Sequence, residues 1–211
     1  MRVTSWIAGL ARLAMAGCGA PDLELEPEDM VSLGDFRLGY NIVLANEVTQ
    51  SPGSREATED ELSDAVRAEM ERRVGRYDGD GLYHIGLRIE AYSLGQTGIP
   101  ILAAPRSIML IALNIWDDAT QEKLNAEPVR ITAYDTAAGP LVGTGFSRSR
   151  EEQLSALAFN AAAEVEDYLE ANAPLWFTPK EGRERVSFTR DPETGQALGA
   201  TPVNLETIET E

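Results

Sequence analysis

The sequence predicts an α+β protein: a two-layer sandwich of a mainly antiparallel sheet with two helices packed on one face, and flexible N- and C-terminal segments. Two observations predict this class. In several segments apolar residues alternate at a period of two, which is typical of strands. Two other segments begin with a capping box and repeat apolar residues every three or four positions, which is typical of amphipathic helices.

The first strand is predicted over residues 36–45, where alternate apolar side chains are expected to share one face: Phe36, Leu38, Tyr40, Ile42 and Leu44. A break follows in the segment SPGSREAT. Thr58 and Glu61 then form a capping box, which begins a helix expected to run to about Tyr77. Its apolar stripe consists of Leu62, Ala65, Val66, Met70 and Val74.

Three further strands are predicted between the helices. Residues 83–91 alternate apolar and polar side chains after the turn Asp78-Gly79-Asp80-Gly81, and this alternation places His84 on the solvated face. Residues 107–116 are apolar on both faces, which indicates a central strand. Residues 129–134 predict another strand, with a short additional piece over residues 141–146.

The second helix is predicted from a capping box formed by Ser149 and Glu152. It is expected to run to about Ala171, because Pro174 should stop it. The cluster Leu175-Trp176-Phe177 is expected to pin this end of the helix to the sheet.

Composition excludes several classes of function. The chain has 211 residues and a formal net charge of −17, which argues against binding to nucleic acid because that affinity depends on basic surfaces. One cysteine and one histidine cannot form an intrachain disulfide or a Cys/His zinc site. The sequence therefore predicts no cofactor, no metal and no catalytic residue, and His84 is interpreted as a surface histidine.

The N-terminal segment has a composition of its own. Residues 1–17 contain no acidic residue, and apolar side chains follow Arg2 up to the small residues around Cys18. Ala16-Gly17-Cys18, preceded by Met15, resembles the lipobox of bacterial lipoproteins. The resemblance implies cleavage before Cys18, acylation of Cys18 and attachment to a membrane through the acyl chains.

The chain resembles uncharacterised lipoproteins of alphaproteobacteria, specifically at Ala16-Gly17-Cys18, and the style of its domain over residues 35–177 is similar to that of the auxiliary lipoproteins of lipid transport. Gly19 after the cysteine implies the periplasmic face of the outer membrane, with the inner membrane or the cytoplasm as alternatives. Removal of Arg2 and Arg12 with the signal would change the net charge from −17 to −19. Attachment would then depend on the acyl chains, since anionic lipid repels such a chain.

Four segments follow from these patterns. Residues 1–17 are predicted to be a signal peptide, residues 18–34 an acidic tether, residues 35–177 the α+β domain, and residues 178–211 a largely disordered acidic tail. Within the tail, a short strand over residues 185–188 is the one ordered element considered.

A contact surface is predicted in the apolar loop of residues 95–105, through Ile99, Ile101 and Leu102; the alternative is that this loop folds over the core. The leading hypothesis is a non-enzymatic, lipid-anchored envelope protein that binds a partner as an accessory subunit of an envelope complex. Two alternatives remain: a periplasmic enzyme that uses carboxylates and a divalent cation, and a cytosolic protein with an uncleaved N-terminal arm, which the charge of Arg12 within the apolar segment favours.

Overall fold

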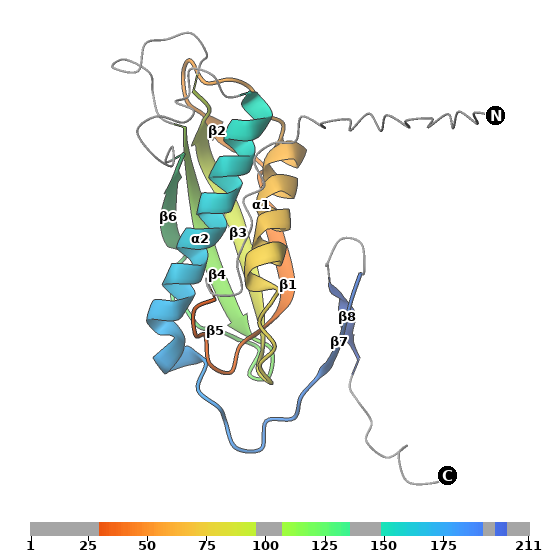
Figure 1. Cartoon of the computed structure of the whole chain (residues 1–211). Helices are drawn as coiled ribbons and strands as arrows, with labels where there is room; N and C mark the ends of the chain where they lie inside the picture. The colour runs from red at the N-terminus through yellow and green to blue at the C-terminus, as the bar shows by residue number, and fades with distance from the viewer. Residues whose placement is uncertain (1–29, 96–106, 136–148, 192–196, 202–211) are drawn as a thin grey trace, which may run out of the picture.

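Two helices cover one face of a six-stranded sheet in the computed structural model, which describes residues 30–95, 107–135, 149–191 and 197–201 (Figure 1). The helices are α1 (Glu59–Val74) and α2 (Arg150–Trp176). The strands of the sheet are β1 (Arg37–Leu44), β2 (Thr49–Gln50), β3 (Leu82–Ser93), β4 (Ile108–Asp117), β5 (Glu122–Lys123) and β6 (Val129–Tyr134). The α+β class with both helices packed against the sheet is therefore confirmed.

The sheet has a mixed strand direction. Strand β3 lies at its centre, with β1 and β2 paired parallel to it on one side and β4 paired antiparallel on the other. Both β5 and β6 then pair antiparallel with β4. Parallel pairing requires the chain to return, after β1, to the end of the sheet at which β1 begins. Helix α1, which lies between β1 and β3 in the sequence, makes this return.

Both predicted capping boxes are present. The Thr58 side chain accepts a hydrogen bond from the backbone N–H of Glu61 at 3.2 Å, and the Glu61 carboxylate accepts one from the N–H of Thr58 at 2.8 Å. Ser149 and Glu152 repeat this arrangement at 3.1 and 2.7 Å. Arg150 bonds to the Glu61 carboxylate, and this contact lowers the pKa of Glu61 to about 2. The N-termini of the two helices are therefore joined.

The ends of the helices differ from the prediction. Helix α1 ends at Val74 rather than near Tyr77, and Gly75 caps it. Helix α2 continues through Pro174 to Trp176 instead of ending at Ala171. The last turn forms despite the proline because Phe177 is buried, with its ring 4.8 Å from that of Phe36 in an edge contact.

The packed part of the chain begins before residue 35. Leu33 lies in the segment predicted as a tether, yet its side chain is 1% exposed within the core. The next residue, Gly34, has a φ of +66°, which suits glycine, and Asp35 N–H donates to the carbonyl of Phe177 at 2.7 Å. The start of the domain is thus bonded to the end of α2.

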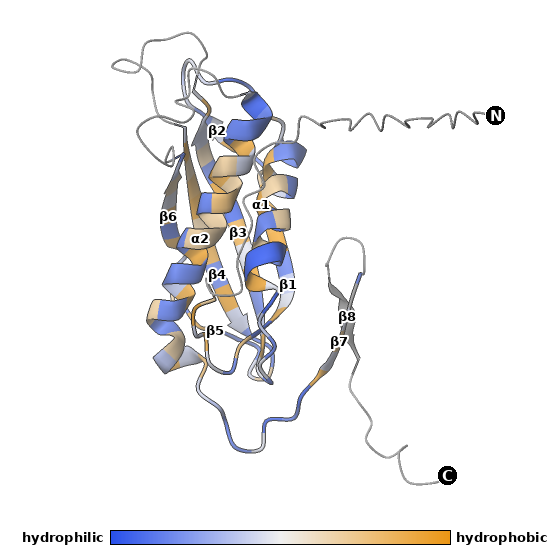
Figure 2. Ribbon diagram, viewed as in Figure 1, coloured by the Kyte–Doolittle hydropathy of each residue, from blue (hydrophilic) through white to orange (hydrophobic). Residues whose placement is uncertain are grey.

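The hydrophobic core lies between the helices and the sheet. Figure 2 shows hydrophilic residues on the outer sides of α1 and α2 and hydrophobic residues along the strands behind them. The core includes side chains from both helices and from strands β1, β3 and β4, among them Leu62, Val66, Met70, Ile85, Leu87, Ile89, Met109, Ile111, Leu157 and Leu169. This burial covers only one face of the sheet.

One buried charge joins the two helices. Glu166 on α2 is 1% exposed and accepts hydrogen bonds from Arg73 at 2.7 Å, Arg76 at 3.0 Å and the Tyr77 hydroxyl at 2.6 Å. Burial and the bond to Glu166 raise the pKa of Tyr77, so its hydroxyl remains a donor at neutral pH. The carboxylate is thus balanced by two guanidinium groups within the helix layer.

Residues 180–188 are in contact with the domain. The sequence predicts a largely disordered tail, whereas Lys180 and Arg183 bond to the buried Asp117 and a hairpin follows, formed by β7 (Ser187–Arg190) and β8 (Ala197–Thr201). The strand considered over residues 185–188 coincides with β7 only at Ser187 and Phe188. Sequence composition missed this because the contacts are charge pairs with residues far away in the chain.

We predict that Glu166→Gln lowers the free energy of unfolding by about 3 kcal/mol, because it leaves the buried Arg73 and the partly buried Arg76 without a carboxylate. Urea denaturation followed by circular dichroism measures this. Glu170→Gln, an exposed change one turn further along α2, is the matched control and should change the value by less than about 0.5 kcal/mol. Equal stability of the two variants would contradict the role given to Glu166.

Candidate functional site

A bulge in β1 turns its apolar side chains outward. Leu38 pairs with Tyr83 and Asn41 pairs with Ile85, so β1 uses three steps where β3 uses two. One extra residue reverses the alternation of faces. Phe36 and Leu38 therefore point into the core, whereas the side chains after the bulge on that same predicted stripe are exposed, at 38% for Tyr40, 52% for Ile42 and 52% for Leu44. The prediction of one shared face for these five residues was wrong.

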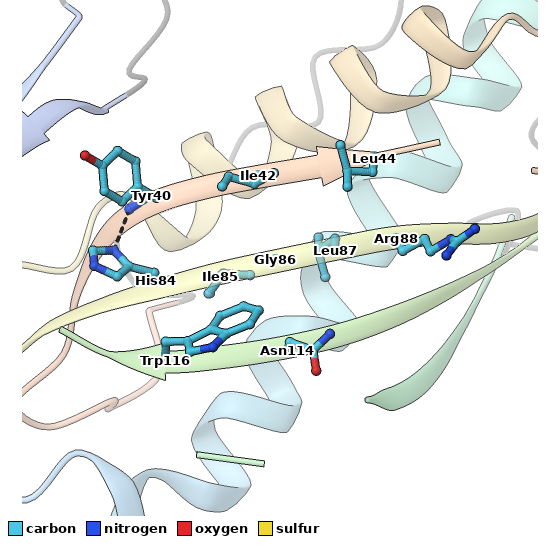
Figure 3. Close-up of a pocket in the computed structure, with 10 residues that line it drawn as sticks. All are labelled: Tyr40, Ile42, Leu44, His84, Ile85, Gly86, Leu87, Arg88, Asn114 and Trp116. Atoms are coloured by element: carbon cyan, nitrogen blue, oxygen red, sulfur yellow. Dashed lines mark hydrogen bonds between the residues drawn. The ribbon is translucent and has the colours of Figure 1, made fainter. Parts of the chain in front are cut away.

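The exposed side chains border a groove on the face of the sheet opposite the helices (Figure 3). Its volume is about 460 Å³, which lies within the range typical of ligand pockets. Strands β1, β3 and β4 supply its lining: Tyr40, Ile42, Leu44, His84, Ile85, Gly86, Leu87, Arg88, Asn114 and Trp116. Since Ile85 and Leu87 direct their side chains into the core, the groove meets mainly their backbone.

Trp116 and Gly86 form the floor of this groove. A Cβ atom on Gly86 would lie 3.0 Å from Cζ3 and 3.3 Å from Cη2 of the Trp116 indole. Because glycine has no side chain, the indole can lie against Gly86, and Figure 3 shows it extending from β4 toward β3. Coverage of a strand glycine by an aromatic ring on the neighbouring strand also protects the exposed backbone. The result is a flat, largely apolar surface.

His84 closes one end of the groove with Tyr40. Its Nδ1 atom accepts a hydrogen bond from the backbone N–H of Tyr40 at 2.9 Å, so the proton of the neutral ring resides on Nε2, which lies 2.9 Å from Oδ1 of Asp118. His84 is on the outward face as predicted, although its side chain is only 17% exposed. Both ring nitrogens are thus engaged in holding the ring in place.

Gly39 makes this contact sterically feasible. A Cβ atom there would lie 2.4 Å from Nδ1 of His84 and 3.1 Å from the carbonyl oxygen of Tyr83. A glycine inside a strand is often the sign of a bulge or of a close approach, and both are found at this position. Gly39 is therefore the one feature of the sequence that could have indicated where β1 changes face.

Polar groups line the other side of the groove. Arg88 pairs with Glu47 at 3.0 Å, and both side chains are well exposed. Lys123 donates to Oδ1 of Asn114 at 3.0 Å. These groups give the groove a polar rim beside the apolar surface of β1, so it presents both kinds of contact to a ligand.

The structure does not describe the four predicted site residues. Cys18, Ile99, Ile101 and Leu102 are outside the described residues. Within the described ranges, no group of three His, Cys, Asp or Glu side chains is arranged to hold a metal ion, and no helix is long and apolar enough to cross a membrane.

Comparison with known proteins gives distant similarity only. No protein-family model and no curated protein sequence matches the chain. A DUF330-family protein from Xanthomonas campestris has a TM-score of 0.39 at 9% identity, over 66% of this chain and 91% of that one. A presumed lipoprotein from Caulobacter crescentus has a TM-score of 0.37 at 13% identity, over 61% and 92%. A minor lipoprotein from Acinetobacter baumannii has a TM-score of 0.30 at 16% identity, over 64% and 93%.

We predict that the neutral ring of His84 is the Nε2–H tautomer, and that Gly39→Ala abolishes this preference because the added methyl group displaces the ring. Long-range ¹H–¹⁵N NMR spectra report the tautomer, and the chain's single histidine makes the assignment unambiguous. The same substitution should lower stability by about 1 kcal/mol through the lost Tyr40 bond. An Nδ1–H tautomer in the unmodified protein would contradict this account of the end of the groove.

Proposed function

We propose that this chain is a lipid-anchored protein of the bacterial cell envelope that acts by binding, as an accessory subunit of an envelope complex. The anchor in this proposal is Cys18, supported by the lipobox-like sequence Ala16-Gly17-Cys18 and by the apolar, acid-free segment before it. The proposed location is the periplasmic face of the outer membrane, in keeping with Gly19.

The groove is the binding site in this proposal, and its apolar wall is the observation that supports it most directly. Ile42 and Leu44 are each 52% exposed and line the groove together with Tyr40 and Trp116, and exposed apolar side chains gathered in this way are typical of a contact site. An apolar segment of a protein partner would bury these side chains, while the rim at Arg88 and Asn114 would accept its polar groups.

Binding fits this surface better than catalysis does. The groove contains one imidazole, and both of its nitrogens already have partners within the fold. A general base needs a free nitrogen that reaches the substrate. We therefore assign His84 a structural role at the end of the groove.

We predict that Cys18→Ser moves the protein from the membrane fraction to the soluble fraction, because it removes the sulfur atom that is to be acylated. Ala20→Ser, outside the lipobox, is the control and should leave the protein in membranes. Fractionation of cells that express each variant measures the difference, and the intact mass of the purified protein shows whether residues 1–17 are lost and acyl mass gained. Unchanged partitioning of Cys18→Ser would contradict lipid anchoring.

We predict that Ile42→Ser weakens binding of the apolar fluorescent probe N-phenyl-1-naphthylamine by about fivefold, since part of an apolar contact is lost. Leu175→Ser is the matched control: Leu175 is 78% exposed on α2, away from the groove, and its loss should leave probe affinity unchanged. Fluorescence titration measures both. A probe that fails to bind the unmodified protein, or that binds both variants equally, would contradict binding at the groove.

A further inference from the structure

The C-terminal segment is fixed to the domain at a buried carboxylate. Asp117, the last residue of β4, is 1% exposed, and one terminal nitrogen of Arg183 lies 2.7 and 2.6 Å from its two carboxylate oxygens. Lys180 Nζ donates to the same carboxylate at 2.9 Å. Burial opposes its ionisation, but the bonds from Lys180 and from the backbone of Ala119, together with the charge of Arg183, lower the pKa of Asp117. Such charge-assisted hydrogen bonds are stronger than hydrogen bonds between neutral groups.

This attachment lies on the helix side of the sheet. Arg183 also donates to the Tyr83 hydroxyl at 2.7 Å, and its guanidinium lies 5.2 Å from the centre of that ring. Tyr83 is a core residue whose ring is stacked on Phe36 at 5.5 Å. Position 183 is therefore held against the inner face.

From there the chain passes to the open face. Arg37, the first residue of β1, donates to the carbonyl of Val186 at 2.7 Å, and Arg185 pairs with Asp78 and Asp80 in the turn before β3. The ring of Phe188, two residues after Val186, lies 5.4 Å from the ring of Tyr40 and nearly perpendicular to it, at 85°. It lies 6.4 Å from the ring of His84. Tyr40 and His84 are the aromatic residues at one end of the groove.

Phe188 contacts the end of the groove from outside. It is not among the residues that line the groove, although both of its aromatic neighbours are. The hairpin of β7 and β8 stands beside β1 in Figure 1, and a two-stranded hairpin has little stability of its own. Its position therefore depends on contacts such as that of Phe188.

We propose that residues 180–189 form a strap that belongs to the binding site: Arg183 fixes it at Asp117, and Phe188 supports Tyr40 and His84 as the end wall of the groove. This inference rests on the proposed function, because it describes how the same groove is kept in shape. Phe188 is a positioning residue in this arrangement, acting on a ligand through Tyr40 and His84. Since coupling between two sites is reciprocal, a ligand in the groove should also hold the strap in place.

The test compares probe affinity in three full-length variants. Phe188→Ala should weaken binding of N-phenyl-1-naphthylamine by about threefold to tenfold, the loss expected for one aromatic pair. Phe188→Tyr, which keeps the ring, should bind within about twofold of the unmodified protein, by the same measure. Thr189→Ala, an exposed change at the next position, should have no effect.

A second measurement tests whether the contact of Phe188 is coupled to ligand binding in the groove or only supports the structure. Trypsin should cut the exposed strap after Arg185, and the probe should slow this cut in the unmodified protein and in Phe188→Tyr but not in Phe188→Ala. Equal affinity and equal protection in Phe188→Ala would overturn the inference, and tighter binding would overturn it too, because Phe188 would then compete with the ligand. If the probe fails to bind the unmodified protein, the proposed function itself is contradicted. If Ile42→Ser reduces binding but Phe188→Ala does not, binding at the groove is supported and only the role of the strap is contradicted.

Discussion

The bulge in β1 determines which side chains this sheet buries and which it leaves to solvent. With regular alternation, Ile42 and Leu44 would join the core beneath the helices and Val43 would point outward. One extra residue near Gly39 reverses this, so Val43 is 6% exposed while its two neighbours form the apolar wall of the groove. Asn41 maintains the reversal, since its side-chain amide donates to the carbonyl of Arg67 on α1 at 3.0 Å.

Elements that depend on neighbouring residues could be predicted from the sequence. A capping box consists of contacts between positions three apart, so Thr58 and Ser149 mark the helix starts correctly whatever the rest of the chain does. The end of α2 depends instead on distant residues. Pro174 disfavours a further turn, but burial of Phe177 against the sheet outweighs this cost, and only the fold shows that contact.

The candidate site was harder to predict for the same physical reason. Residues 36–45 are apolar at every second position from Phe36, and Val43 and Ala45 are apolar as well, so alternation alone cannot show that the stripe divides at Gly39. Gly86 resembles any glycine within a strand until Trp116 is seen to lie across it. The predicted contact residues Ile99, Ile101 and Leu102 are outside the described residues, so that surface stays a prediction. The groove is formed by strands that are far apart in the sequence.

The last two residues of β4, Trp116 and Asp117, make contacts on opposite faces of the sheet. Neighbouring residues in a strand point to opposite faces, so Trp116 forms the floor of the groove while Asp117 holds Arg183 on the helix side. Asp117 therefore has a specific structural role, which the net charge of the chain does not reveal. A carboxylate buried on the helix side of the sheet retains a basic segment, and that segment brings Phe188 to Tyr40 on the opposite face. Lys180 and Arg183 in turn offset the burial of Asp117 and hold its pKa below the ordinary value, so the carboxylate and the segment that it retains stabilise each other through charge-assisted hydrogen bonds.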